Sequence, residues 1–336
     1  MADSLEHAPE HTPAGGLVAV TGATGFVGRH VVRELRRRGR RVRALARDAA
    51  KAGRVLPEDG VELVVGDALD TGAMDRLAEG ADALVHLVGI RREASGGATY
   101  EKMHVGATRS AIGAASRAGV ARYLHMSALG ARPEAATAYH RTKWRAEEIV
   151  RDSGLAWTIL RPSLILGAGG EFMDMAIGWA RGTEPPRRFL PYFSKPTPTV
   201  RARARDTGDP AALVQPVSVT GVAQACVEAG EREQAIGEIY PLVGSEVCSW
   251  PELLVMVRDA TPGAKKNLEP HGVPGVLAAR LAWALGRVGL GSLLPFGPSE
   301  PIMAIEDNTG GSAKALTDLG VEPEPLARIL AASVAA

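Results

Sequence analysis

The chain has 336 residues, which at roughly 150 residues per domain allows two domains or one large α/β unit with an added lobe. Its 46% hydrophobic and 23% charged residues are typical of a folded globular protein and exclude an intrinsically disordered one. The 39 Lys and Arg residues nearly balance the 38 Asp and Glu residues, so no positive field favours nucleic acid. We therefore expect no nucleic-acid partner.

The cysteine content and the first residues of the sequence bear on the cellular location of the protein. Cys226 and Cys248 cannot form a disulfide framework, which is typical of a reducing compartment. The lead Met1–Gly16 lacks the apolar core of a secretory signal and predicts a disordered segment. No uncharged apolar run reaches the roughly 18 residues of a membrane span. The sequence therefore predicts a cytoplasmic protein, with peripheral membrane contact as the alternative.

Short β-rich runs alternate with helical patterns in the first half of the chain. Strands are predicted at Leu17–Thr21, Arg41–Ala46, Val61–Val65, Ala83–Val88, Tyr123–Met126 and Trp157–Leu160. Helices are predicted at Arg29–Arg38, Met74–Ala78, Tyr100–Ala118 and Tyr139–Ser153. Strands separated by single helices favour right-handed crossovers. The sequence therefore predicts an α/β fold, a doubly wound parallel sheet of the Rossmann type.

The pattern changes after Gly167. The segment Glu184–Pro216 is rich in Pro and Arg, and its portion Val200–Asp206 carries alternating charge. We interpret the segment as an exposed loop or edge hairpin, with a basic substrate flap as the alternative.

The rest of the chain predicts a return to the sheet and then a helical lobe. Gln215–Val219 predicts a strand, Gly221–Ala229 a helix, and the residues beyond Tyr240 mostly helices. We expect a nucleotide-binding domain from residues 17–167 and 215–242. A smaller, mostly helical substrate or partner lobe would comprise residues 168–214 and 243–336.

A glycine-rich loop joins the first predicted strand to the first predicted helix. The run Val20–Gly28 reads VTGATGFVG. Gly22 can adopt positive φ, Gly25 has no Cβ to block a phosphate, and Gly28 lets the helix pack close to the strand. The free N–H groups and the helix dipole attract an anion. The loop therefore predicts a site for the pyrophosphate of a dinucleotide.

The end of the second predicted strand bears on the choice of cofactor. A site for NAD usually carries an acidic residue there, whereas this strand ends in Ala46, Arg47 and Asp48. The guanidinium of Arg47 can bind a 2′-phosphate, which favours NADP(H) over NAD(H). Asp48 could instead bind a ribose hydroxyl, so NAD(H) stays the alternative.

Tyr139 and Lys143 form a YxxxK pair at the start of a predicted helix. A spacing of four residues places both side chains on one helix face. An ammonium beside a phenol lowers the phenol's pKa, so Tyr139 is predicted to exchange a proton with a carbonyl or an alcohol.

Several further motifs carry a resemblance to a known family. They are Thr21–Gly28, Val64–Asp70, His86–Gly89, His125–Ala131, Tyr139–Glu148, Thr158–Gly167 and Gln215–Ala223. Through them the chain resembles the short-chain dehydrogenase/reductase superfamily. Within it, the chain is similar to the atypical, extended-type branch that includes the accessory nucleotide-binding subunit of respiratory complex I and epimerase/dehydratase-like proteins. The resemblance runs from Leu17 to Ala225 and more weakly to the C-terminus.

The strand pattern and the resemblance together give a set of expected site residues. The catalytic candidates are Tyr139, Lys143 and Ser127. The cofactor-binding candidates are Gly22, Thr24, Gly25, Phe26, Val27, Gly28, Arg47, Asp67, Ala68, Leu87, Val88, Gly89, Lys143, Pro162 and Ser163. The resemblance implies that Pro162 and Ser163 pass the nicotinamide ring and that Lys143 also binds its ribose. No HxH or HExxH spacing occurs, so no metal is predicted.

The chain departs from the family pattern in two places. Active members carry a Ser or Thr, typically the second of a Ser-Ser pair, where this chain reads Ser127–Ala128. The Asn that family members carry in the fourth helix has no clear match, although His104 and Thr108 lie nearby.

The sequence supports two alternative hypotheses about the function of the protein. The first is an NAD(P)-dependent oxidoreductase or epimerase-like enzyme, which transfers hydride to or from a small molecule and uses Tyr139 as acid/base. Its substrate would lie between the carboxyl edge of the sheet and the lobe. The second is a catalytically weak or inactive NADP(H)-binding protein for assembly or redox sensing.

The stretch Val276–Phe296 is apolar and carries only Arg280 and Arg287 as charges. We interpret it as a helix that covers the substrate cleft. A face for a membrane surface or a protein partner is the alternative.

Overall fold

The computed structural model describes residues 15–57, 59–94, 97–196, 211–290 and 293–335. Most of the N-terminal lead and the segment Val200–Asp206 lie outside the described residues, so the predictions made for them stay predictions. No helix in the described ranges is long and apolar enough to cross a membrane.

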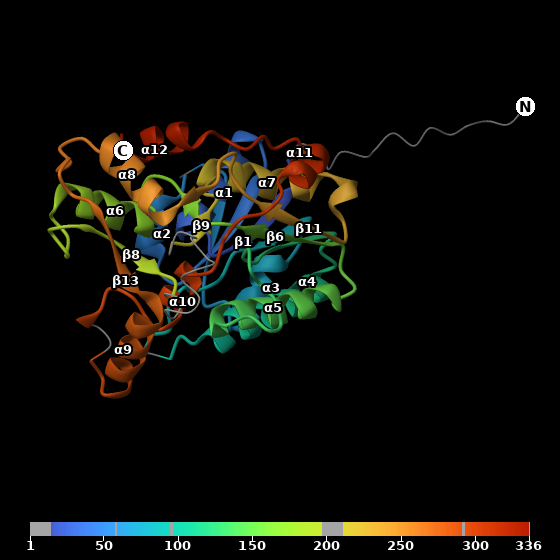
Figure 1. Cartoon of the computed structure of the whole chain (residues 1–336). Coiled ribbons are helices and arrows are strands. Elements are labelled where there is room, and N and C mark those ends of the chain that lie inside the picture. Colours follow the sequence, from blue (N-terminus) through green and yellow to red (C-terminus); the bar gives the residue numbers. More distant parts are fainter. Residues whose placement is uncertain (1–14, 58, 95–96, 197–210, 291–292, 336) are drawn as a thin grey trace, which may run out of the picture.

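A seven-stranded sheet forms the centre of the molecule, with the strand order β11-β6-β5-β4-β1-β2-β3 (Figure 1). All neighbouring strands run parallel. The strands are β1 (Leu17–Thr21), β2 (Arg41–Ala46), β3 (Val61–Val65), β4 (Ala83–His86), β5 (Arg122–Met126), β6 (Trp157–Pro162) and β11 (Glu238–Leu242). The chain moves outward from β1 to β3 and then crosses back to β4, so the strand order reverses between β1 and β4. Ligands of such sheets bind in the crevice at this reversal.

Helices cover both faces of the sheet (Figure 1). One face packs against α1 (Phe26–Arg37), α7 (Val219–Glu231) and α11 (Ala313–Leu319). The other face packs against α3 (Thr71–Ala78), α4 (Ala107–Ala118) and α5 (Ala138–Arg151). Two layers of helix around a parallel sheet confirm the predicted doubly wound α/β fold.

A third hydrophobic core lies in the lobe beside the carboxyl edge of the sheet. It joins α6 (Glu171–Arg181), α8 (Trp250–Ala260) and α12 (Leu326–Val334). Short strand pairs support it: β7 (Ile165–Leu166) with β10 (Val217–Ser218), β9 (Leu213–Val214) with β12 (Cys248–Ser249), and β8 (Leu190–Ser194) with β13 (Pro270–Pro274). Beyond β13 follow α9 (Gly275–Arg287) and α10 (Ser299–Ala304).

Several predicted elements have different bounds in the structure. The first helix begins at Phe26 rather than Arg29, because Gly25 is its N-cap and the glycine loop leads directly into the helix. Strand β4 ends at His86 rather than Val88. In the predicted strand Gln215–Val219, the residues that pair with β7 are Val217 and Ser218.

Two helical segments differ from the sequence interpretation. The helix α2 (Ala49–Val55) was not predicted; its N-terminus is capped by Asp48, which accepts the Lys51 N–H. The long helix predicted from Tyr100 begins with a π-helical segment, Glu101–Gly106, before α4. Such π-helical segments are rare in proteins, and those that occur often lie at functional sites.

The prediction of one helix from Val276 to Phe296 was wrong. The helix α9 ends at Arg287, followed by a turn at Gly289, which has φ +76°. Glycine adopts this left-handed conformation without a Cβ clash, so the chain turns there.

Candidate cofactor and active site

The glycine loop has the geometry that the sequence predicts. Gly22 has φ +68°, and a Cβ on Gly28 would lie 2.1 Å from the Gly22 carbonyl oxygen. The Gly25 N–H donates to the Gly22 carbonyl at 3.0 Å and closes the turn. A side chain at Gly28 would therefore push α1 away from β1.

The N-terminus of α1 is open to an anion. Its N-cap is Gly25, which is exposed and supplies no side-chain cap, and the first turn carries no acidic residue. The first N–H groups of a helix have no partner within the helix, and the helix dipole adds positive potential there. This loop therefore fits the pyrophosphate of a dinucleotide.

The parallel register brings the other candidate cofactor residues to the same edge of the sheet. Val20 of β1 pairs with Ala44 of β2 and with Val85 of β4, and Ala46 pairs with Val65 of β3. The residues that follow these strands therefore lie at the same edge of the sheet as the glycine loop: Arg47, Asp67, Ala68, Leu87, Val88 and Gly89.

Arg47 and Asp48 have different surroundings at the end of β2. Arg47 is exposed and, among the described residues, makes no hydrogen bond or ion pair. Asp48 accepts the Lys51 N–H at 3.0 Å as the cap of α2. Arg47 is therefore free to bind an anion, whereas one oxygen of Asp48 is already engaged by the protein.

Tyr139 lies in a group of aromatic rings at the start of α5. The centroids of Tyr100, His104 and His140 lie 5.8, 5.3 and 5.1 Å from its ring. Burial raises the pKa of Tyr139 to about 12, and the Arg91 guanidinium opposes this only in part. The prediction of a lowered phenol pKa was wrong for the protein without cofactor, because burial disfavours the phenolate.

Lys143 is buried one turn further along α5. Its Nζ donates to the Met126 carbonyl at 2.9 Å at the end of β5. A Cβ on Gly89 would lie 2.9 Å from this Nζ, so the glycine lets the loop after β4 approach the ammonium. Burial lowers the pKa of Lys143 to about 8, against the opposing effect of Glu147.

The hydroxyl of Ser127 is engaged behind the site. It donates to Glu147 Oε1 at 2.5 Å, and this carboxylate is fully buried. Glu147 also accepts from Arg161 at 2.5 and 2.8 Å and from Arg151 at 3.1 Å. The hydroxyl predicted to orient a substrate is therefore used to join β5, α5 and β6. Glu147 was not among the predicted site residues, although it lies four residues after Lys143, on the same helix face.

The π-helical segment brings His104 to the position next to the tyrosine. Its Nδ1 is hydrogen-bonded to Thr142 Oγ1 at 2.8 Å, and its Nε2 to the Ile90 carbonyl at 3.0 Å. Thr108 instead donates its hydroxyl to the His104 carbonyl at 2.5 Å. Of the two residues considered for the missing Asn, His104 is therefore the one beside Tyr139.

Pro162 ends β6 and Ser163 follows it at the same edge. The Ser163 hydroxyl donates to the Gln215 carbonyl at 2.6 Å, and its N–H donates to the Leu242 carbonyl at 2.9 Å. Ser163 therefore joins the end of β6 to Gln215 and to the end of β11.

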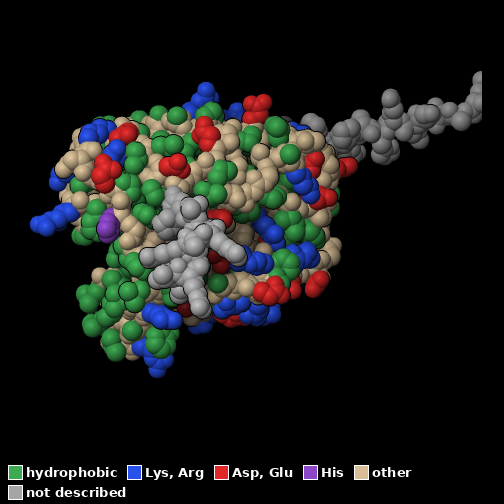
Figure 2. Space-filling model, in the orientation of Figure 1, with side chains coloured by type: hydrophobic (Ala, Val, Ile, Leu, Met, Phe, Trp, Pro, Cys, Tyr) green, Lys and Arg blue, Asp and Glu red, His purple; other side chains and the backbone are tan. Residues whose placement is uncertain are grey.

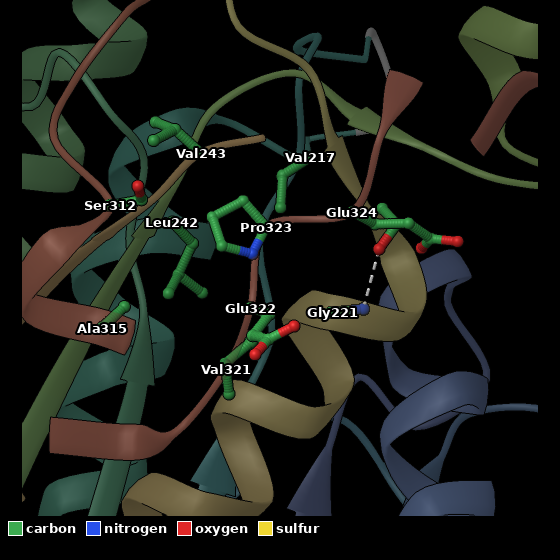
Figure 3. A pocket seen from close by; sticks show the side chains of 11 residues that line it. Val217, Gly221, Leu242, Val243, Ser312, Ala315, Val321, Glu322, Pro323 and Glu324 are labelled. Atoms are coloured by element: carbon green, nitrogen blue, oxygen red, sulfur yellow. Dashed lines mark hydrogen bonds between the residues drawn. The ribbon is translucent and has the colours of Figure 1, made fainter. Parts of the chain in front are cut away.

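Two cavities lie away from the predicted site residues. Figure 3 shows the first, where Val217, Leu242 and Pro323 meet beside the start of α7. The second is lined from the amino edge of the sheet by Val18, Asp82 and other residues. None of the predicted site residues lines either cavity. The predicted site residues therefore lie outside both cavities, at the carboxyl edge of the sheet and on the loops that follow its strands.

Three buried histidines lie beneath the site and affect stability. Burial lowers the pKa of His86 to about 3 and that of His104 to about 2, and places the pKa of His125 well below its ordinary value of 6.5. The folded state therefore keeps these rings neutral where the unfolded chain takes up protons.

Acid is expected to destabilise the protein from near pH 6.5 downward. Since the folded pKa values are depressed, the stabilisation present above pH 6.5 is lost as the pH falls toward 3. Each such histidine contributes at most about 1.4 kcal/mol per pH unit to the fall in unfolding free energy. Urea titrations between pH 7 and 5 measure how steeply the unfolding free energy falls with pH. His86→Asn should make this fall less steep by the contribution of one histidine. His271→Asn controls for the substitution itself, and an unchanged slope in His86→Asn would contradict this assignment.

The parallel sheet with its strand-order reversal, the open glycine loop and the Tyr139–Lys143 helix face define a dinucleotide-binding α/β protein. Residues 22–171 match the family model described as NAD(P)H-binding. A reductase from Streptomyces griseus, which acts on (4-alkanoyl-5-oxo-2,5-dihydrofuran-3-yl)methyl phosphate, is 33% identical over 267 residues, 79% of this chain and 81% of that protein. The chain belongs to the short-chain dehydrogenase/reductase superfamily, in its atypical, extended-type branch, and contains an NAD(P)-binding domain.

Other relatives extend the comparison. A ceramide reductase from Caulobacter vibrioides is 39% identical over 163 residues, 47% of this chain, and this match spans 49% of that protein's length. The mouse mitochondrial NADH dehydrogenase [ubiquinone] 1 alpha subcomplex subunit 9 is 26% identical over 322 residues, 93% of this chain and 78% of that one. The crystal structure of gox2253 shares the fold, with a TM-score of 0.70 at 24% identity, and covers 95% of this chain and 97% of that chain.

Proposed function

We propose that this protein is an NADPH-dependent reductase of a small carbonyl compound or a conjugated alkene. The observation that carries the proposal is the position of Tyr139 and Lys143 at the carboxyl edge of the sheet, next to the open glycine loop. The reductase names of the Streptomyces griseus and Caulobacter vibrioides relatives support the same class of reaction.

Tyr139 would act as the proton donor in this reaction. Bound at the sheet edge, the reduced nicotinamide would supply the hydride. A phenol with a pKa of about 12 is protonated at neutral pH, as a general acid for a carbonyl oxygen must be. Tyr139 is therefore in the protonation state that donation to a carbonyl oxygen requires.

Lys143 would hold the cofactor's ribose and assist the phenol. Its buried ammonium has one carbonyl partner from the protein, Met126, and two donors left for hydroxyl groups. A ligand at the Gly89 loop would then exclude water from the ammonium and from Tyr139. Electrostatic assistance between such groups is stronger where water is excluded.

The preference for NADP(H) rests on Arg47. We expect Arg47→Asp to raise the Kd for NADPH by about 10- to 100-fold, because a charge-assisted hydrogen bond contributes about 1.5–3 kcal/mol. The Kd for NADH should change little. Fluorescence titration with both cofactors measures this. Arg54→Asp, an exposed charge reversal further along α2, is the matched control. Equal losses for both cofactors would show that Arg47 does not bind the 2′-phosphate.

A second candidate function is an NADP(H)-binding protein that acts in assembly or redox sensing. Two observations favour this function. The Ser127 hydroxyl is already hydrogen-bonded to Glu147, and Ala128 stands where family members usually carry the second hydroxyl. The similarity to the mouse complex I subunit favours a protein partner in the same way. Tight cofactor binding would then stabilise the fold by mass action.

One experiment separates the two functions. The nucleotide that copurifies with the full chain is identified by mass spectrometry, and NADPH oxidation is then followed with a panel of ketones, aldehydes and conjugated enones. Turnover that depends on Tyr139 supports the reductase. A tightly held nucleotide that no substrate oxidises supports the binding protein. Purified chain that binds neither NADPH nor NADH would overturn both.

A further inference from the structure

Large apolar side chains gather on the exposed side of α9 and the turn after it. Of the fourteen exposed large hydrophobic residues in the described part of the chain, six lie between residues 277 and 293. They are Leu277, Leu281, Trp283, Val288, Leu290 and Leu293, and we call them the α9 patch. Figure 2 shows hydrophobic side chains gathered at the lower left, where Figure 1 places α9.

The helix presents its large side chains outward and its small ones inward. Its buried residues are Gly275, Ala278, Ala279 and Ala282, and it packs on β13 and α10. Leu277 and Leu281 are 65% and 51% exposed, and Val288 is 68% exposed. Residues at spacings of four and seven share one face of a helix, so the exposed leucines continue as a stripe toward the turn. A helix that only completed the fold would bury these side chains.

The charged side chains of the chain segment that carries the patch have one sign. Residues 270–296 contain Arg280 and Arg287 and no Asp or Glu, although acidic and basic residues balance over the whole chain. The Arg287 guanidinium lies 5.2 Å from the centre of the Trp283 ring. Leucines and a tryptophan on one face, flanked by arginines, are typical of helices that lie in the headgroup region of an anionic membrane.

We propose that the α9 patch docks on an anionic membrane surface, with the apolar side chains among the acyl chains and both arginines at the phosphates. A second copy of this chain would be a less suitable partner for the α9 patch. A symmetric contact through this face would bring the arginines of both copies together without an acidic partner.

The residues that follow the patch are joined to the body of the protein by hydrogen bonds and a ring contact. The Arg92 guanidinium donates to Glu300 at 2.9 and 3.1 Å and to the Pro295 carbonyl at 2.7 Å. The Phe193 and Phe296 rings meet edge to face at 5.1 Å. Arg92 belongs to the loop after β4, so docking would fix the orientation of the nucleotide-binding domain on the membrane.

Vesicle sedimentation of the full chain tests this proposal. We expect binding to vesicles of equal parts phosphatidylglycerol and phosphatidylcholine, and much weaker binding to phosphatidylcholine alone. Trp283, 58% exposed in the free protein, should shift its fluorescence to shorter wavelength and become protected from acrylamide. Leu281→Ser should weaken partitioning about tenfold, and Trp283→Ser at least as much. Val247→Ser, at an exposed site outside the patch, should leave it unchanged.

Substitution of Arg280 and Arg287 tests the electrostatic part of the proposal separately. Arg280→Gln and Arg287→Gln should each weaken binding to the anionic vesicles about fivefold, without an effect on phosphatidylcholine vesicles. Absence of binding to the anionic vesicles at 0.1 M salt would overturn the proposal. So would binding that Leu281→Ser and Trp283→Ser do not weaken. A dimer that Trp283→Ser dissociates, with no vesicle binding, would assign the face to a second copy instead.

Discussion

Tyr139→Phe is expected to lower kcat/KM for NADPH-dependent reduction by about 10²- to 10⁴-fold, the usual contribution of a general acid. The substitution removes one hydroxyl and keeps the ring among Tyr100, His104 and His140. The Kd for NADPH should therefore stay within about twofold of the wild-type value. The decrease of absorbance at 340 nm, followed with a substrate from the panel, measures the loss.

The matched control is Tyr123→Phe. Tyr123 belongs to β5, its side chain is fully buried in the core, and its hydroxyl has no hydrogen-bond partner among the described residues. Its removal should leave turnover unchanged. If Tyr139→Phe kept full activity on an active substrate, another group would have to donate the proton, and the proposed role of Tyr139 would be lost.

Glu147→Ala is expected to have the largest effect on stability. Its fully buried carboxylate accepts hydrogen bonds from Ser127, Arg151 and Arg161. Removing one partner of a buried ion pair costs about 3–5 kcal/mol, because the remaining charges lose their partner without recovering full hydration. The side chains of Arg151 and Arg161 are 26% and 21% exposed, so we expect the lower end, about 3 kcal/mol.

Urea unfolding followed by far-ultraviolet circular dichroism measures this loss. The matched control is Glu148→Ala on the next residue of α5, whose side chain is exposed, and it should change the unfolding free energy by less than about 0.5 kcal/mol. A Glu147→Ala protein as stable as Glu148→Ala would show that the network does not stabilise the fold. Glu147→Ala should also release the Ser127 hydroxyl, so comparing its turnover with the wild type shows whether that hydroxyl can serve catalysis.

The sheet and the glycine loop could be predicted because their signals are local. Buried parallel strands read as short apolar runs, such as Leu17–Thr21, and a turn that needs positive φ selects glycine at position 22. The short α2 was missed because its seven residues are too few for a periodic pattern. Its one local signal was Asp48, a residue type that caps helices, followed by helix-forming alanines.

The state of the candidate active site could not be predicted from the sequence. The YxxxK spacing correctly places Tyr139 and Lys143 on one helix face. The direction of the Tyr139 pKa shift depends on burial, to which Tyr100 and His104 contribute from a distant part of the chain. The partner of the Ser127 hydroxyl depends in the same way on how α5 packs against β5.

The alternation of strands and helices that defines the parallel sheet, the anion-binding loop and the class of cofactor were determined by the sequence alone. These properties follow from backbone conformation and hydrophobic periodicity, which act over a few residues. Only the tertiary structure decided that His104 lies beside Tyr139, that Glu147 engages Ser127, and that α9 turns its leucines to the solvent. Each of these depends on the distances between segments far apart in the chain, and hydrogen bonding and burial are set by those distances.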